Sequence, residues 1–144
     1  MGGRRAAYES YLDKHVKSDR LYLRLRETAH GRALLITPEI TELQSKVAPG
    51  FELAVIEGKT RVIVSLEMQD WSRFSISDYK FFMAGVSASS VKEIVDEQLI
   101  RTLYPYAFPH DRVFIAEFEG NLTGELKVQT SPGQFIFNLG GASL

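Results

Sequence analysis

Few residues in this chain have the types and spacing that catalysis requires. The segment GVSAS at 85–89 begins like a nucleophile elbow, but Ser89 stands where that motif needs its second glycine. The three histidines, His15, His30 and His110, are far apart and show no metal-ligand spacing. The sequence has no glycine-rich phosphate loop followed by Lys and Ser or Thr. We therefore predict that the chain is not an enzyme and needs no metal or cofactor.

Two carboxylates near the end of the chain are candidates for an acid/base pair. Glu117 and Glu119 are separated by one residue. This region is predicted to be helical, and side chains two positions apart on a helix point in different directions. We therefore expect no acid/base pair at these residues.

Composition limits the class of protein. The 144 residues suffice for one domain with a buried core, and 44% of them are hydrophobic. A net charge of -1 argues against a general nucleic-acid partner. No window approaches the roughly 18 apolar residues of a membrane helix, so we expect no membrane insertion. Cysteines are absent, which fits the reducing cytoplasm. We predict a single cytoplasmic domain over residues 1–144.

The elements that would carry these side chains begin with strands. Apolar residues alternate with polar ones at 20–27 and again at 61–68, which is typical of half-buried strands. Residues 34–47 are predicted to be extended, with Pro38 at a sheet edge. Residues 73–86 are also predicted to be extended, with a change of phase near Tyr79. Residues 1–17 form either an N-terminal arm or a helix.

Helices are predicted after these strands. Ser90 and Glu93 have the spacing of a capping box, and apolar residues follow at three- and four-residue intervals. The predicted helix covers 90–104 and ends before Pro105. A second helix is predicted after Pro109, with Gly120 as its stop. The fold class is therefore α+β, an antiparallel sheet followed by helices.

Aromatic residues are concentrated in two parts of the chain, at 74–83 and 104–118. One face of a sheet and its helices cannot hide all of these rings, so we expect some of them to form an apolar surface. Phe114 and Phe118 are assigned to the core. For the other rings, core and surface both remain open.

The segment LYPYA at 103–107 is similar to the L-[FY]-P-Y motif of SecB-type chaperones. Other segments agree in order with strands of that family. TPEIT at 37–41 resembles the start of the second strand, TRVIVSLEM at 60–68 the third, and YKFFMAGV at 79–86 the end of the fourth. The L-x-V segment at 126–128 also fits.

This resemblance implies a SecB-like fold of four antiparallel strands with helices on one side, assembled as a homotetramer. It also implies nucleotide-independent holding of unfolded polypeptides in apolar grooves. One branch of the family hands clients to the export motor SecA, and another protects antitoxins of toxin–antitoxin systems. This chain lacks the polar tail and acidic surface of the export branch. We therefore expect the solitary or toxin–antitoxin role, with an antitoxin as one client.

Two sets of residues are predicted to carry this function. The expected client-binding residues are Phe74, Ile76, Tyr79, Phe81, Met83, Tyr104, Tyr106 and Phe108. The expected oligomer-interface residues, on one stripe of the predicted helix, are Val91, Val95, Leu99 and Leu103. An alternative is a phage or prophage structural or assembly protein that uses the same apolar surface for permanent contacts. A third is a small-ligand-binding domain with an enclosed apolar pocket.

Overall fold

A computed structural model describes residues 2–22, 28–47, 55–67, 79–96, 100, 112–130 and 133–139. Its helices and strands, in chain order, are α1 (Gly2–His15), β1 (Lys17–Tyr22), β2 (Thr28–Leu35), α2 (Pro38–Val47), β3 (Lys59–Glu67), β4 (Lys80–Met83), β5 (Val86–Ser87), β6 (Ser90–Ile94), β7 (Arg112–Glu119), β8 (Glu125–Gln129) and β9 (Gln134–Asn138).

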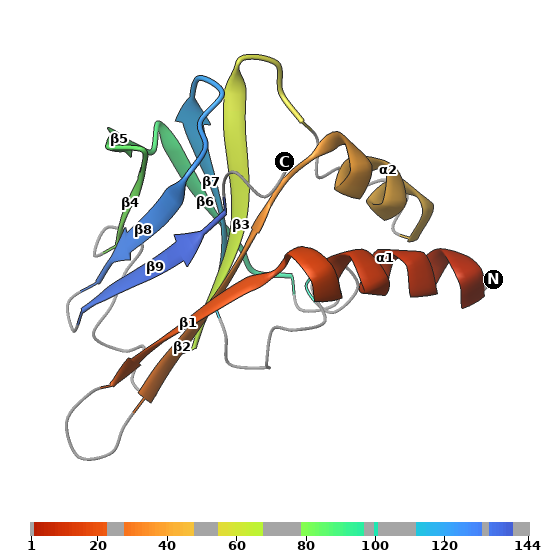
Figure 1. Ribbon diagram of the computed structural model, residues 1–144, viewed down its shortest axis with the longest axis horizontal. Helices are drawn as coiled ribbons and strands as arrows, with labels where there is room; N and C mark the ends of the chain where they lie inside the picture. The colour runs from red at the N-terminus through yellow and green to blue at the C-terminus, as the bar shows by residue number, and fades with distance from the viewer. Residues whose placement is uncertain are drawn as a thin grey trace.

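The strands form two antiparallel sheets. Sheet A has the order β1-β2-β3-β7-β6, and sheet B has the order β5-β4-β8-β9. The two helices lie beside sheet A, on the side away from sheet B (Figure 1). Helices, sheet A and sheet B therefore make three layers, with one apolar core on each face of sheet A.

The predicted α+β fold, a four-stranded sheet followed by helices, is wrong. The described residues contain two sheets, of five and four strands, and both helices come before β3. The strand predicted at 61–68 is confirmed as β3, with Val62, Val64 and Leu66 buried between the sheets. It is not half-buried as predicted, because Ile63 and Ser65 are buried on its other face. The helix alternative for the N-terminal segment is also confirmed, as α1.

The helix predicted over 90–104 is wrong at its start. Residues 90–94 form β6, which pairs with β7, and the amide of Ile100 donates to the carbonyl of Asp96. Residues 97–99 and 101–104 of the predicted helix lie outside the described residues. The helix predicted after Pro109 is likewise wrong, because Arg112–Glu119 is a strand. Sheet A is covered on both faces, so both faces of its strands carry apolar residues. Apolar and polar residues therefore do not alternate in the sequence as they do in a half-buried strand.

The segment around Pro38 is helical, not extended as predicted. Pro38 is the first residue of α2. At this position the backbone amide has no partner within the helix, so proline loses no hydrogen bond there. Thr37 precedes it as the N-cap, and its Oγ1 accepts a hydrogen bond from the amide of Ile40 at 3.3 Å. These are ordinary helix-start signals, and the edge-strand interpretation of the proline overlooked them.

The side chain of Tyr11 joins the two helices. Its hydroxyl shares a hydrogen bond with Thr37 Oγ1, and the side chain is 7% exposed. Burial raises the pKa of Tyr11 above its ordinary value of 10.0, although the hydrogen bond to Thr37 opposes the shift. The folded state therefore holds this proton more tightly than the unfolded chain does.

One continuous stretch of chain passes from sheet B to sheet A. The amide of Ala88 donates to Phe81 in β4 at 2.9 Å, and the next amide, that of Ser89, donates to Glu117 in β7 at 2.7 Å. Residues 86–94 thus pair first with one sheet and then with the other. On the opposite side, the edge strands β1 and β9 meet, and Asp19 Oδ2 accepts from the amide of Ile136 at 2.8 Å. The two sheets form a flattened, partly closed barrel.

Gly31 in β2 makes room for the aromatic side chains of β9. A Cβ at this position would lie 2.9 Å from Cζ of Phe137 and 3.0 Å from Cδ1 of Phe135. These two rings are stacked, with centroids 6.1 Å apart, and are almost fully buried. Glycine is needed here for space, not for an unusual backbone conformation.

We predict that Gly31→Ala lowers the free energy of unfolding by about 1–3 kcal/mol, because the buried rings cannot move away from the new methyl group. Urea denaturation of the purified protein measures this change. Gly3→Ala is the control, since a Cβ at Gly3 meets nothing within 4 Å. Equal losses in both variants would contradict the packing argument.

We predict a pH-dependent effect of Tyr11→Phe. Since the pKa of Tyr11 is raised in the folded state, its contribution to stability is complete below pH 10.0 and is lost as the pH rises through the folded pKa. The free energy of unfolding should therefore fall less steeply above pH 10 in Tyr11→Phe than in the wild type. Thermal denaturation between pH 8 and 11 tests this, and parallel curves would rule it out.

Candidate functional site

Three of the predicted client-binding residues lie in the core. Tyr79, Phe81 and Met83 are 5%, 2% and 0% exposed, because the inward phase of β4 points them between the sheets. The rings of Tyr79 and Phe81 pack on Phe114, with centroids 5.5 and 5.9 Å away. In this conformation they offer no surface to a client. The other five, Phe74, Ile76, Tyr104, Tyr106 and Phe108, lie outside the described residues.

The predicted oligomer-interface residues do not form a helical stripe. Val91 belongs to β6 and packs, half-buried, against the core between the sheets. Val95 follows the strand and is 79% exposed. Leu99 and Leu103 lie outside the described residues.

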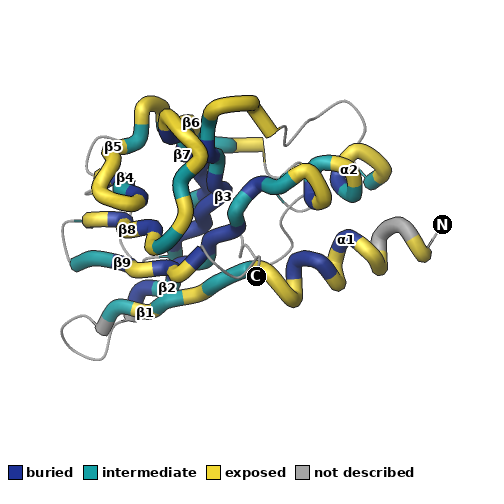
Figure 2. Tube along the Cα trace, turned by 45° about the horizontal axis from the view of Figure 1, so that its top comes forward, coloured by how far each residue is buried: buried dark blue, intermediate teal, exposed yellow. Residues whose placement is uncertain are grey.

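Among the described residues, the outer face of sheet B carries an open hollow with apolar and polar lining. No helix covers it among the described elements, and exposed and buried residues alternate along β8 and β9 (Figure 2). An open hollow of about 570 Å³ lies on this face. Its lining residues are Phe82, Ala84, Gly85, Gly124, Glu125, Lys127, Gln129 and Gln134.

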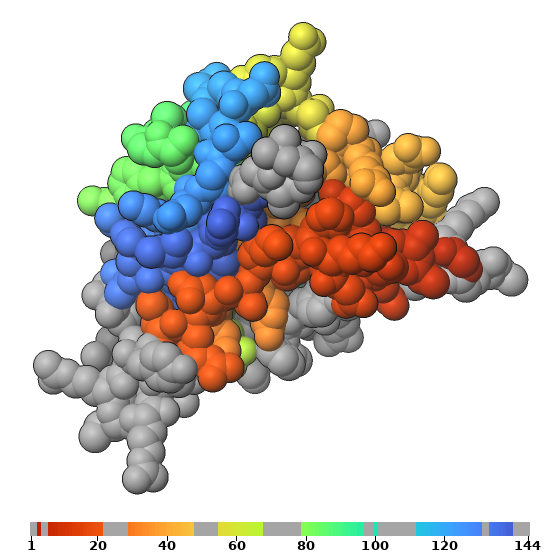
Figure 3. All heavy atoms as spheres, in the orientation of Figure 1, coloured from red at the N-terminus to blue at the C-terminus, as the bar shows by residue number. Residues whose placement is uncertain are grey.

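Apolar and charged groups stand side by side on this outer face. Lys127 pairs with Phe82 on one side and with Ile136 on the other, so these three form one row across the sheet. Ile136 is 43% exposed, and Val86 at the edge of the sheet is 37% exposed. The space-filling view shows the residues of β4 and β5 (green) adjoining those of β8 and β9 (blue) (Figure 3). A surface with this mixture is typical of protein–protein contacts.

The polar groups of the face have few partners within the chain. Gln129 donates its side-chain amide to the Gln134 oxygen at 3.3 Å. Glu125 and Lys127, two residues apart on β8, make no ion pair or side-chain hydrogen bond with any part of the chain that the structure describes. Their charges are therefore available to a partner.

Two tight backbone segments form one end of the hollow. Ala84 and Gly85 connect β4 to β5 with φ angles of 50° and 78°, which is the pattern of a type I′ hairpin turn. Gly124, with φ 106°, opens β8. Because Gly85 and Gly124 have no side chains, the hollow stays open between them.

Thr60 fixes the loop that leads into this end of the hollow. Its Oγ1 donates to the Gly120 carbonyl at 2.7 Å and accepts from the Leu122 amide at 2.8 Å. The amide of Gly120 also donates to Gly58 at 2.8 Å. Thr60 is 7% exposed, so water cannot readily replace these bonds.

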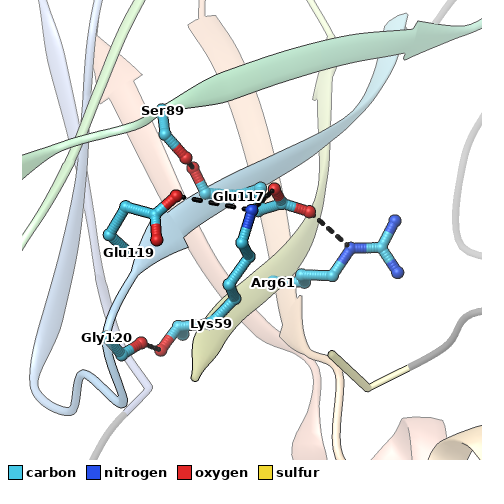
Figure 4. Close-up of polar contacts among 7 residues, drawn as sticks. Lys59, Arg61, Ser89, Glu117, Glu119 and Gly120 are labelled. Carbon is cyan, nitrogen blue, oxygen red and sulfur yellow. Dashed lines mark hydrogen bonds and ion pairs between the residues drawn. The ribbon is translucent and has the colours of Figure 1, made fainter. Parts of the chain in front are cut away.

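A charged network occupies the neighbouring part of sheet A (Figure 4). Lys59 Nζ lies 3.1 Å from Glu117 Oε2 and 3.4 Å from Glu119 Oε1, and Arg61 Nε lies 3.4 Å from Glu117 Oε1. Ser89 Oγ donates to the backbone carbonyl of Glu117 at 3.0 Å. The two glutamates do not point apart as predicted, because in a strand residues two apart share a face.

The charges within this network balance one another. The hydrogen bonds to Glu117 and then to Glu119 raise the pKa of Lys59 above its ordinary value of 10.5. The lysine therefore stays protonated at neutral pH, and the charges of two cations balance those of two carboxylates. Its role is to tie β3 to β7 and to the start of β6.

Arg112 forms a second ionic contact at the other end of β7. Its Nε and Nη2 lie 2.8 and 2.6 Å from the two carboxylate oxygens of Glu93 in β6. The guanidinium also lies over the rings of Tyr79 and Phe114, 5.7 and 5.4 Å from their centroids. All of these partners lie on β7, on β6 or directly before β4, so the contact holds these strands together.

No cluster of three or more His, Cys, Asp or Glu side chains suited to a metal ion occurs among the described residues. Within the same residues, no helix is long and apolar enough to cross a membrane. Comparisons with protein-family models, with curated proteins and with solved structures find no match to this chain. Membership of the SecB-type family therefore stays a prediction from the LYPYA motif.

The sequence analysis missed the residues of the outer face of sheet B. The alternation in ELKVQ and QFIFN was the available signal, since it separates Glu125, Lys127 and Gln129 from the buried Leu126 and Val128. Phe82 was overlooked because the binding residues predicted in this segment were Tyr79, Phe81 and Met83. Their side chains lie on the opposite, buried face.

We predict that Thr60→Val lowers the free energy of unfolding by about 1–3 kcal/mol, because it leaves a buried carbonyl and amide without partners. It should also loosen the loop beside the hollow, seen as faster amide exchange at Leu122 and Gly120 by hydrogen-exchange NMR. Thr60→Ser keeps the hydroxyl and should preserve the slow exchange. Equal loss of protection in Thr60→Ser, which keeps the hydroxyl, would contradict the role assigned to the Thr60 hydrogen bonds.

Proposed function

We propose that this chain is a non-catalytic polypeptide-binding protein, and that the outer face of sheet B is its contact surface. The observation that carries the proposal is the open hollow on this face, with Phe82 among its lining residues and Ile136 exposed on the same row of the sheet. Amide and charged side chains beside these apolar groups provide hydrogen bonds for a partner's backbone and side chains.

One form of this function is nucleotide-independent holding of an unfolded polypeptide, with an antitoxin as one client. The similarity of LYPYA to the SecB-type motif supports it, as do the exposed apolar groups of the outer face. The four-stranded sheet that the resemblance implies is overturned, so it lends no support. A cytoplasmic location stays a prediction from the sequence.

The second form is an assembly protein, such as a phage or prophage structural component, with a permanent partner on the same face. The rigid construction of this surface favours this form. The turn at Ala84 and Gly85 and the start of β8 at Gly124 border the hollow, and Thr60 fixes the loop before β8. A holding protein needs surfaces that adapt to many sequences, whereas an assembly contact is built for one.

Aggregation suppression tests the holding form. The wild-type protein should suppress aggregation of a chemically denatured client at near-stoichiometric ratios, equally with and without ATP. Phe82→Ser and Ile136→Ser should each weaken binding by about 1–2 kcal/mol, roughly tenfold, and the double variant more strongly.

Val55→Ser is the matched control, because Val55 and Ile136 are both 43% exposed but Val55 lies before β3 and outside sheet B. Suppression reduced equally by all variants would show that general surface hydrophobicity, not this face, binds the client. No suppression of any client by the folded protein would exclude the holding form and leave the assembly form.

A further inference from the structure

We infer that the polypeptide bound on the outer face of sheet B is a second copy of this chain, related by a two-fold axis. The inference rests on the proposed function, because it names the partner of the same surface. The arrangement of charge on β8 is the observation that leads to it.

Lys127 points outward from the middle of β8 and Glu125 from its first position, with Leu126 buried between them. They lie about 7 Å apart along the strand. Consider a face-to-face dimer whose two-fold axis lies parallel to the sheets, midway between the two copies. Where this axis crosses β8 at right angles over Leu126, it places Glu125 opposite Lys127 of the second copy. Symmetry then forms the same ion pair a second time.

The apolar groups fit the same arrangement. Phe82 pairs with Lys127 in the sheet, so the axis carries Phe82 of the second copy to the end of the hollow formed by Ala84 and Gly85. The hollow has no side chain at Gly85 or at Gly124, and so it has space for a ring. Ile136 comes to lie opposite Asn138 of the second copy.

Two other two-fold arrangements of this face are unfavourable. An axis along β8, or one that crosses it at Lys127, sets Lys127 against its own copy, and like charges in direct opposition are destabilising. Of these three arrangements, only the axis over Leu126 brings opposite charges together.

The size of the face sets the expected strength of the dimer. Three strands of four or five residues cover about 15 Å by 15 Å, which is well below the roughly 800 Å² per partner of a typical stable interface. The dimer should therefore form reversibly, with a dissociation constant in the micromolar range or above.

Charge reversal tests the two-fold contact. Sedimentation velocity from micromolar to several hundred micromolar protein should show a concentration-dependent dimer for the wild type. Glu125→Lys and Lys127→Glu should each weaken it by about tenfold or more, because each places two pairs of like charges in opposition. An equimolar mixture of the two variants should dimerise again, since both ion pairs re-form between unlike chains. The double variant should also dimerise.

Glu39→Lys is the control, because this exposed residue lies on α2, away from sheet B, and its reversal should leave the dimer unchanged. A monomer at every concentration, or a dimer that neither reversal weakens, would overturn the inference. Failure of the mixture to dimerise would overturn the proposed register. If the wild type is monomeric but Phe82→Ser still abolishes client holding, the proposed function stands without self-association.

Discussion

The fit between the small residues of β2 and the rings of β9 is the constraint on which the rest of this structure depends. Stacked sheets lie about 10 Å apart, so large side chains on one inner face need small ones opposite. Ala29, Gly31 and Ala33 provide that space on sheet A, and Phe135 and Phe137 fill it from sheet B. Burying one phenylalanine contributes about 1.5–3 kcal/mol, so this contact helps to hold the sheets together. It also fixes which side chains of sheet B face sheet A.

The outer surfaces follow from this arrangement. Sheet A lies between two layers and has a core on each face, with α1 and α2 closing the side away from sheet B. Among the described residues, sheet B is covered on one face only, and the side chains of its other face are open to a partner. The strand that crosses between the sheets at Ala88 and Ser89, and the bond from Ile136 to Asp19, keep this open face in a fixed position. A binding surface built on paired strands is more rigid than one built on loops, which suits one defined partner.

The ionic contacts within sheet A join strands, whereas the proposed contact surface lies on sheet B. Each charged contact described here, at Lys59 and at Arg112, joins neighbouring strands and satisfies its own charges. Glu125 and Lys127, which make no ion pair with any described residue, lie instead on the one sheet face that the described elements leave uncovered. Because the negative charge precedes the positive charge along β8, a second copy pairs its opposite charges with them only when its β8 runs antiparallel.

The sequence by itself determined the local periods. The alternation at 61–68 predicted β3 and the face that it buries between the sheets, and a helix was one of the two forms predicted for residues 1–17. It could not determine β6 and β7, because strands buried on both faces carry apolar residues in a pattern that also fits a helix. Val91 packs on one core and Ile94 on the other, yet their spacing is that of a helical stripe. Only the tertiary structure decided which side chains of β4 face inward. That choice depends on how the two sheets pack, including the space beside Gly31. This choice placed Phe81 in the core and Phe82 on the surface.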